Sequence, residues 1–438
     1  MPSAVWDITS ICNLNCKHCY NSEKYKEQGK NDLSYEDCVE MITFLEQNSF
    51  DSIALLGGEP LAHPHIVEIL QLCKEKNINL FFTTNGVLLD DTMIKHVIKS
   101  SATSIFISLD GADAKTNDYI RGDGVFDIVT TNIINLTKQL RDENSKILVR
   151  IAYTIFSGNL HSAKEMVNLC KRLNVDCLNV TPLINSGSAA ETWDAMELDN
   201  FKMFDAIEEI VEFASKVYPS LNISVEARPW VIWYLRKRYP AWVTYPLGHT
   251  KCMVLDGAIY IKADGDLHPC GLYTFKLGKE AQSKGYFNAA DTFNVMDVAN
   301  VGEIYNSKYH TEFLASMKIL QKDEYHYNCK SCPVRDDCSP CPYQFIGEVS
   351  DCNWTAKKIN EMLDNIGEWT VLEKANMPVK FITNHYGQIA FELLNKNAGI
   401  RENHEEFLRV ADEDISILDY IEILNDLEKK FIIKTNRG

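Results

Sequence analysis

Residues 4–20 read AVWDITSICNLNCKHCY, a short apolar run followed at once by three cysteines. The run Ala4–Thr9 is typical of a buried β-strand, and Cys12, Cys16 and Cys19 follow it in a C-x3-C-x2-C pattern. Three thiolates on one short loop can bind three irons of a cubane cluster and leave the fourth iron open to an external ligand. Structural zinc usually takes four protein ligands in paired knuckles, so a single triplet fits zinc poorly.

Five further apolar runs continue an alternation of strand-like and helical segments up to about residue 184. They are Ile53–Leu56, Leu80–Thr84, Ser104–Leu109, Ile147–Ile155 and Cys177–Val180. Ser34, with Asp37 three residues later, predicts the start of the first intervening helix. Strands that alternate with helices predict an α/β fold with a parallel sheet, here a partial (β/α)6 barrel of the TIM type. Because ligands gather where the strands of such folds end, the loops after the first four strands are the candidate site.

The composition narrows the classes of function. The 438-residue chain has 44 Lys and Arg against 61 Asp and Glu, a formal net charge of −17, which disfavours nonspecific binding to nucleic acid or to an anionic membrane. We find no signal peptide and no membrane-spanning stretch, so we expect a cytoplasmic protein with no nucleic-acid or membrane partner. In a reducing compartment clustered cysteines bind metal more often than they form disulfides, and ten of the fourteen cysteines are clustered.

The cysteine triplet and three later motifs resemble the radical S-adenosylmethionine (radical SAM) superfamily. Gly57-Gly-Glu-Pro60 follows the second strand, Thr84-Asn-Gly86 the third, and Ser108-Leu-Asp-Gly111 the fourth. Each motif alone is also typical of a turn or a helix start. Their order and their common position at strand ends are what carry the resemblance.

The resemblance implies a set of residues that bind S-adenosylmethionine (SAM). Glu59 would be an anionic acceptor for the methionyl amine, and Ser108 and Arg121 would bind the methionyl carboxylate, which suits a guanidinium fork. His18 stands where the family usually has an aromatic residue near the adenine. The catalytic cluster would be held by Cys12, Cys16 and Cys19. The full cofactor-binding set that we predict is His18, Gly57, Gly58, Glu59, Pro60, Asn85, Ser108, Asp110 and Arg121.

Seven cysteines in the second half resemble the SPASM extension, which carries two auxiliary [4Fe-4S] clusters. They are Cys252, Cys270, Cys329, Cys332, Cys338, Cys341 and Cys352, and the spacing between Cys338 and Cys341 is one residue shorter than in the family. The resemblance implies one auxiliary cluster held by Cys329, Cys332, Cys338 and Cys352. The other would be held by Cys252, Cys270 and Cys341, with one position open to a substrate thiolate or another ligand. The spacing from 329 to 341 alone would also suit a zinc ribbon.

The remaining four cysteines lie among apolar residues at helix or strand spacing. They are Cys38, Cys73, Cys170 and Cys177. Free cysteine in such a setting is a small buried hydrophobe, so we expect these four in the core.

The predicted organisation has four parts: a radical SAM barrel over 1–184, a bridging helical region over 185–250, an SPASM domain over 251–355, and a small α+β, winged-helix-like module over 370–438. The last part resembles the PqqD-like element that binds leader peptides by adding a strand to its sheet, and residues 378–383 could supply the exposed edge. The alternative is a cap over the SPASM region. The aromatic and basic stretch 228–242 is expected to form a helix on the barrel, or else to contact a peptide.

The function implied by the resemblance is that of a radical SAM/SPASM peptide maturase with three [4Fe-4S] clusters. Such an enzyme cleaves SAM to a 5′-deoxyadenosyl radical that abstracts hydrogen from a ribosomally made precursor peptide and installs a thioether or carbon–carbon cross-link. Its electron would come from a donor such as flavodoxin or ferredoxin. One alternative is a formylglycine-forming sulfatase-maturing enzyme, but those have an Asp base where this chain has Gly271. A non-catalytic iron–sulfur or zinc protein would leave the motifs at 57–60 and 108–111 unexplained.

Overall fold

The protein is described here from a computed structural model. The structure describes residues 3–22, 29–227, 229–239, 253–268, 271, 293–307, 310–311, 313–314, 350–366, 370–374, 389–390, 393–394, 400–411, 415–429 and 433–436. These residues form two compact units, each described by itself. Among them, 229–238 and those from 350 onward belong to the second unit, and all others to the first.

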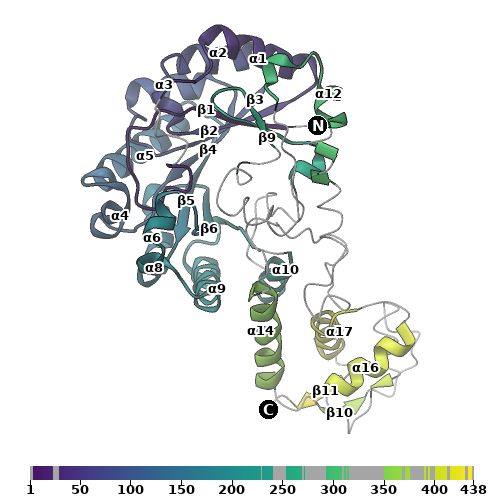
Figure 1. Ribbon diagram of the computed structural model, residues 1–438. Coiled ribbons are helices and arrows are strands. Elements are labelled where there is room, and N and C mark those ends of the chain that lie inside the picture. The colour runs from purple at the N-terminus through teal and green to yellow at the C-terminus, as the bar shows by residue number, and fades with distance from the viewer. Residues whose placement is uncertain are drawn as a thin grey trace. The chain divides into compact units, whose positions relative to one another are not determined.

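The first unit is built on a nine-stranded sheet with the order β7-β6-β5-β4-β3-β2-β1-β8-β9 (Figure 1). The strands are β1 (Ser3–Thr9), β2 (Ser52–Gly57), β3 (Asn79–Thr84), β4 (Ala102–Ser108), β5 (Leu148–Ile155), β6 (Cys177–Pro182), β7 (Asn222–Val225), β8 (Ile259–Ile261) and β9 (Leu267–His268). Neighbours from β7 through β1 to β8 run parallel, and only β9 is antiparallel. The six predicted strands and the mostly parallel α/β fold are therefore confirmed.

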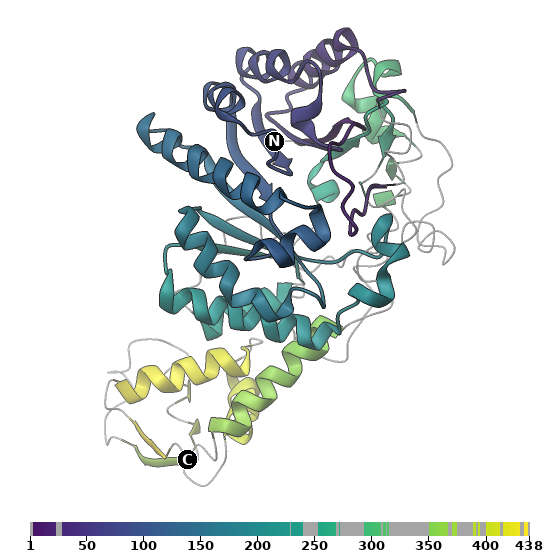
Figure 2. The same ribbon diagram turned by 90° about the vertical axis from the view of Figure 1, so that its left-hand side faces the viewer.

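Helices α1 to α6 lie along the outer side of this sheet (Figure 2). The elements between and beyond the strands are α1 (Tyr35–Gln47), η2 (Pro60–Ala62), α2 (Ile66–Glu75), α3 (Asp91–Lys99), α4 (Ala114–Arg121), α5 (Val125–Asp142), η3 (Leu160–Ser162), α6 (Ala163–Leu173), α7 (Ser188–Glu191), α8 (Trp193–Met196), α9 (Asn200–Val217), η4 (Met253–Asp256), η6 (Val295–Asp297) and α12 (Val301–Asn306). The predicted start of α1 is confirmed, since Ser34 and Asp37 form a capping box.

The two faces of the sheet differ in burial. In β4, Ile105 and Ile107 are fully buried, whereas Phe106 and Ser108 between and after them are only partly buried. Successive side chains of a strand point to opposite faces, so one face is packed and the other is more open. The four cysteines predicted to be core residues are indeed buried: Cys38, Cys73 and Cys170 are 0% exposed and Cys177 is 2% exposed.

Two parts of the sheet were not predicted. β7 lies within residues 185–250, where the sequence suggested helices alone, and it pairs with β6 through Asn222 and Cys177. At the other edge, β8 pairs in parallel with β1, which places Tyr260 opposite Val5. Both strands are four residues or shorter, too short for an alternating pattern to reveal them.

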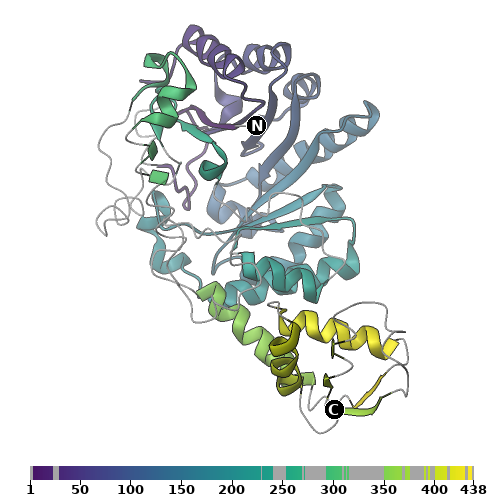
Figure 3. The same cartoon turned by 90° about the vertical axis from the view of Figure 1, so that its right-hand side faces the viewer.

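The second unit combines helices with a two-stranded antiparallel sheet (Figure 3). Its elements are α10 (Pro229–Arg238), α14 (Ser350–Ile366), β10 (Thr370–Lys374), α16 (Ile400–Ala411), α17 (Ile417–Lys429) and β11 (Ile433–Asn436). Trp230 of α10 packs with Cys352 and Ala356 of α14. Lys237, also on α10, pairs with Asp419 (2.5 Å) and Glu422 (3.1 Å) of α17. The helix expected in the stretch 228–242 is α10, which belongs to the second unit; its position on the barrel stays a prediction.

The proposed peptide-binding edge at 378–383 lies outside the described residues. The winged-helix-like fold of 370–438 therefore stays a prediction. In the part of the chain that is described, no helix is both long and apolar enough to cross a membrane.

Candidate active site

The cysteine loop begins directly after β1, and Asp32 fixes its start. The Asp32 carboxylate accepts hydrogen bonds from the Thr9 hydroxyl (2.6 Å), the Ser10 hydroxyl (2.6 Å) and the Ser10 backbone N–H (2.9 Å). Sequence analysis missed Asp32, since a single acidic residue in a loop forms no pattern. The contact holds the backbone two residues before Cys12.

All three cysteines of the loop are partly buried, and burial raises the pKa of each thiol. For Cys19 the pKa rises to about 11. Such thiols stay protonated at neutral pH unless a cation binds them, and a coordinated metal deprotonates a thiol outright. No group of His, Cys, Asp or Glu in the described residues could hold a single metal ion. A cubane cluster does not require the three cysteines to converge on one ion, because each cysteine binds a separate iron.

The Gly57-Gly-Glu-Pro60 turn packs directly on this loop. Gly57 has a φ of +128°, and a Cβ there would lie 2.5 Å from the Thr9 carbonyl oxygen. The Gly58 N–H donates to that Thr9 oxygen (2.8 Å), and the Glu59 N–H donates to the Ile11 oxygen (2.8 Å). Pro60 is buried and opens η2. Both glycines are needed because the two backbones touch.

Glu59 is completely buried and joins the ends of β2 and β3. Its carboxylate accepts hydrogen bonds from the Thr84 hydroxyl (2.6 Å), the Asn85 N–H (2.7 Å) and the Leu61 N–H (3.0 Å). Burial raises the pKa of Glu59, although these donors oppose the rise. Three donors from the chain itself occupy the carboxylate, so its predicted contact with the methionyl amine stays a prediction.

Asn85 extends the link to the cysteine loop. Its side-chain amide donates to the Asn13 Oδ1 atom (2.7 Å), and its own oxygen accepts the Val87 N–H (3.0 Å). Asn13 lies between Cys12 and Cys16 and was also missed by sequence analysis. The end of β3 therefore contacts the triplet loop itself.

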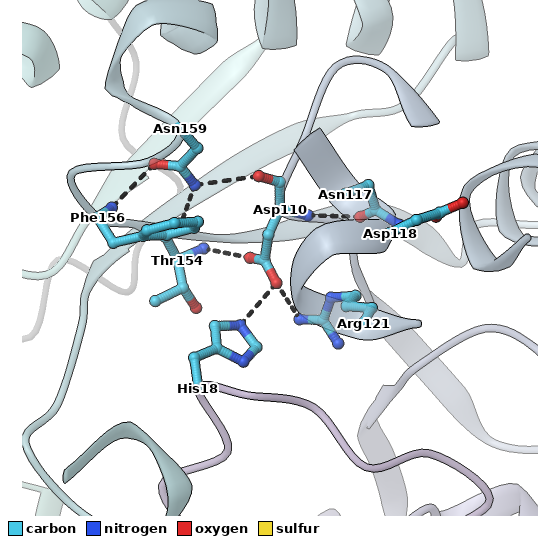
Figure 4. Close-up of polar contacts among 8 residues, drawn as sticks. All are labelled: His18, Asp110, Asn117, Asp118, Arg121, Thr154, Phe156 and Asn159. Atoms are coloured by element: carbon cyan, nitrogen blue, oxygen red, sulfur yellow. Dashed lines mark hydrogen bonds and ion pairs between the residues drawn. The ribbon is translucent and has the colours of Figure 1, made fainter. Parts of the chain in front are cut away.

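Asp110, after β4, is bound by two predicted site residues at once (Figure 4). Its Oδ2 atom lies 2.7 Å from His18 Nε2 and 2.6 Å from Arg121 Nη2. Burial alone would raise the pKa of Asp110, but the charge of Arg121 and the hydrogen bond from His18 hold it at about 2. For Arg121, burial works against the charge, yet the Asp110 carboxylate keeps the pKa above its usual value. The three residues are each more than nine-tenths buried.

The residues that surround the loop fit a bound cluster and SAM. His18 Nδ1 and Arg121 Nε are buried atoms that have no hydrogen-bond partner among the described residues. Buried nitrogens rarely lack a partner in a complete structure, so both point to a ligand. Ser108, at the end of β4 and partly buried, stands two residues before Asp110. A cation, a hydroxyl and three thiols are a suitable donor set for an iron–sulfur cluster and a zwitterionic amino acid.

The second cysteine set is mostly beyond what the structure describes. Cys252, Cys270, Cys329, Cys332, Cys338 and Cys341 lie outside the described residues. Cys352 is on α14 and is 8% exposed. Gly271 is described, and a Cβ there would lie 3.2 Å from the Tyr260 ring, whose hydroxyl donates to the Asp7 carboxylate.

The fold and site together define a class: an α/β protein with a mostly parallel sheet, a three-cysteine loop after its first strand and a buried arginine paired with Asp110. Residues 6–170 match the model of the radical SAM superfamily. Residues 252–333 match the model of the SPASM iron–sulfur cluster-binding domain. The chain therefore carries a radical SAM domain over residues 6–170 and an SPASM domain over residues 252–333.

Named relatives share parts of this chain. Mycofactocin maturase MftC from Mycobacterium tuberculosis is 30% identical over 188 residues, 43% of this chain and 46% of the relative. The AdoMet-dependent heme synthase from Nitratidesulfovibrio vulgaris is 24% identical over 345 residues, 77% of this chain and 86% of the relative. The chain thus spans about half the length of mycofactocin maturases such as MftC.

A solved structure has the same fold. Streptococcus suis SuiB bound to S-adenosylmethionine superposes with a TM-score of 0.58 at 19% identity, over 80% of this chain and 75% of SuiB. A sequence identity of 19% supports a shared fold and nothing further.

Proposed function

We propose that this protein is a radical SAM/SPASM maturase that modifies a ribosomally synthesised precursor peptide and installs a thioether or carbon–carbon cross-link. The observation that carries the proposal is the meeting of three strand ends at the cysteine loop. There the Gly57-Gly-Glu-Pro60 turn, Asn85 and Asp110 each hydrogen-bond to residues within or next to the triplet. The names of the relatives add support, since MftC is called a maturase and SuiB has been solved with its precursor peptide SuiA.

The chain's own residues would divide the work at the site. Cys12, Cys16 and Cys19 would hold the catalytic [4Fe-4S] cluster and leave one iron for SAM. Arg121 and Ser108 would bind the methionyl carboxylate, and His18 would lie near the adenine. When bound, the cluster and SAM would supply the radical chemistry that removes a hydrogen atom from the substrate. The protein must hold the target carbon and exclude water, and we assign that task to the less buried face of the sheet, where Phe106 and Ser108 lie.

The SPASM cysteines would hold two auxiliary [4Fe-4S] clusters, which makes three clusters in all. Cys329, Cys332, Cys338 and Cys352 would complete one. The other, on Cys252, Cys270 and Cys341, would keep an open position. These clusters would accept the electron left after bond formation or bind a substrate thiol. Flavodoxin or ferredoxin would reduce the catalytic cluster in the cytoplasm, where thiols remain free.

Residues 370–438 would recognise the leader of the precursor peptide. The described part offers a small antiparallel sheet, β10 with β11, beside α16 and α17. A small sheet with an accessible edge can bind an extended peptide through backbone hydrogen bonds.

Sulfatase maturation is the weaker candidate. It needs an Asp after the second SPASM cysteine, but this position is Gly271, and the Tyr260 ring leaves little space for a side chain there. A Cβ at 271 would require the Tyr260 ring to shift by a few tenths of an ångström.

The proposal is tested by anaerobic reconstitution followed by two measurements. Iron and sulfide are quantified, and 5′-deoxyadenosine is measured after reduction with and without each short peptide that the reading frames neighbouring this protein's gene encode. We expect 5′-deoxyadenosine and a peptide product two mass units lighter, consistent with an oxidative cross-link. Zinc in place of iron, or no SAM cleavage on reduction, would refute an enzymatic role. SAM cleavage with a porphyrin product and an unmodified peptide would point instead to heme synthesis.

A further inference from the structure

The Asp110 carboxylate connects three segments that are distant in the sequence. Its Oδ2 atom contacts His18 of the cysteine loop and Arg121 at the end of α4, as described above. Its Oδ1 atom accepts the backbone N–H of Thr154 in β5 at 2.8 Å (Figure 4). One side chain therefore joins the cluster loop, a helix and a strand.

The backbone of Asp110 is fixed as well. Its N–H donates to Asn117 Oδ1 (3.0 Å), and its carbonyl oxygen accepts from Asn159 Nδ2 (3.0 Å). Both asparagines are 0% exposed. The Asn159 oxygen in turn accepts the Phe156 N–H (2.9 Å), which anchors the network in the segment after β5. A buried and fully bonded network of this kind holds its members in one geometry.

The carboxylate itself is poorly placed to touch a ligand. It is 0% exposed, and three donors from the protein already occupy its two oxygens. Its two side-chain partners differ in this respect. His18 Nδ1 and Arg121 Nε are buried nitrogens that have no partner in the described part of the chain. The free hydrogen-bonding capacity thus lies on the two residues that Asp110 holds.

We propose that Asp110 is a positioning residue that locks His18 and Arg121 into one arrangement, so that the adenosyl and methionyl ends of SAM are bound as a unit. This inference rests on the proposed function. Because Asp110 can only accept, His18 Nε2 must donate to it, which leaves Nδ1 to form a hydrogen bond with the adenine. Arg121 is held by the same Asp110 oxygen and presents its remaining donors to the methionyl carboxylate of SAM. In this proposal the part that Asp110 plays in cofactor binding is indirect.

The test compares Asp110→Asn with Asp113→Asn in anaerobically reconstituted full-length protein. Asp113 caps α4 through the Thr116 N–H (2.8 Å) and is exposed, and Asn is an equally good cap. Binding of SAM, methionine and 5′-deoxyadenosine is measured by equilibrium dialysis, together with the change that SAM causes in the EPR spectrum of the reduced cluster. We expect Asp110→Asn to weaken SAM binding about tenfold or more, to weaken both fragments, and to alter the EPR change. Asp113→Asn should match the wild type.

Two results would overturn the inference: unchanged affinities in Asp110→Asn, or a loss confined to one fragment. If this variant cannot hold its cluster, the test is a double-mutant cycle. It measures the SAM affinity of His18→Ala, Arg121→Lys and the double variant. Residues that share a partner give non-additive losses of SAM affinity, whereas additive losses contradict a common positioning residue. A wild-type protein that binds no SAM would instead refute the proposed function.

Discussion

A Cβ atom on Gly58 would lie 2.1 Å from the carbonyl oxygen of Ile11 and 2.5 Å from its carbonyl carbon. The same oxygen accepts the Glu59 N–H. The turn after β2 thus packs against the backbone that leads into the cysteine triplet, and no side chain fits between them.

Gly58→Ala should therefore displace the cysteine loop. We expect the variant to lose the iron of the catalytic cluster and SAM cleavage, because even a methyl group must push the backbone of Ile11 away. Iron quantitation and EPR after anaerobic reconstitution measure this. The matched control is Gly302→Ala in α12, where the nearest atom is the end of the flexible Asn300 side chain. A Gly58→Ala protein with a normal EPR signal would show that the loop can move aside.

Replacing Cys12, Cys16 and Cys19 together by Ala should abolish SAM cleavage and leave the auxiliary clusters bound. Loss of one cubane in three removes about a third of the iron. Iron analysis and 5′-deoxyadenosine measurement check the two halves of this expectation. Iron close to zero would contradict separate clusters. Cys73→Ala, a change at a fully buried core thiol, serves as the control and should retain all three clusters.

The four core cysteines should resist alkylation in the native apoprotein at pH 8. Burial raises the pKa of Cys38 and Cys73 to about 12 and that of Cys177 to about 11, so these thiols are both shielded and protonated. Cys170 is shifted in the same direction. Peptide mapping by mass spectrometry should find label on the partly exposed triplet first, and on the core four only in denaturant. Early labelling of Cys177 would place it in an open lumen rather than in the core.

Deleting residues 370–438 should weaken binding of the precursor peptide but spare SAM cleavage in its absence. The deletion also removes the partners of Lys237 on α17, so α10 loses a contact. Lys237→Ala is the control for that effect, and Lys357→Ala, which breaks an exposed pair with Glu361 (3.6 Å), is a reference change at another surface lysine. Fluorescence anisotropy of a labelled leader peptide provides the readout. Equal affinity for the full-length and shortened proteins would refute leader recognition by this part.

The six strands β1 to β6 could be predicted because each is an apolar run bounded by turn residues. A period of two or a short apolar run is a local property, and so is the capping box of Ser34 and Asp37. β7 and β8 could not be predicted, since they become strands only by pairing with β6 and β1. The assignment of α10 to the second unit likewise depends on packing, through Trp230 and Lys237, and on nothing in its own periodicity.

The candidate site also contains residues that the sequence predicted and residues that it did not. The spacing of Cys12, Cys16 and Cys19 carries its own chemical meaning, and so do the motifs that begin at Gly57 and Ser108. Asp32, Asn13 and Asn159 carry none alone, because they are common polar residues in loops. Their importance lies in contacts across 23 residues for Asp32 with Thr9, 72 for Asn85 with Asn13, and 49 for Asn159 with Asp110.

The sequence by itself determined the kind of fold, the cysteine inventory and the motifs of the strand ends, because these follow from local periodicity and spacing. Only the tertiary structure decided what Asp110 contacts. The motif Ser108-Leu-Asp-Gly111 marks it as a site residue, but a carboxylate becomes a ligand contact or an internal anchor according to the donors that packing brings to it. Here packing brings His18 from 92 residues away, together with Arg121 and Thr154, and the side chain is buried between them.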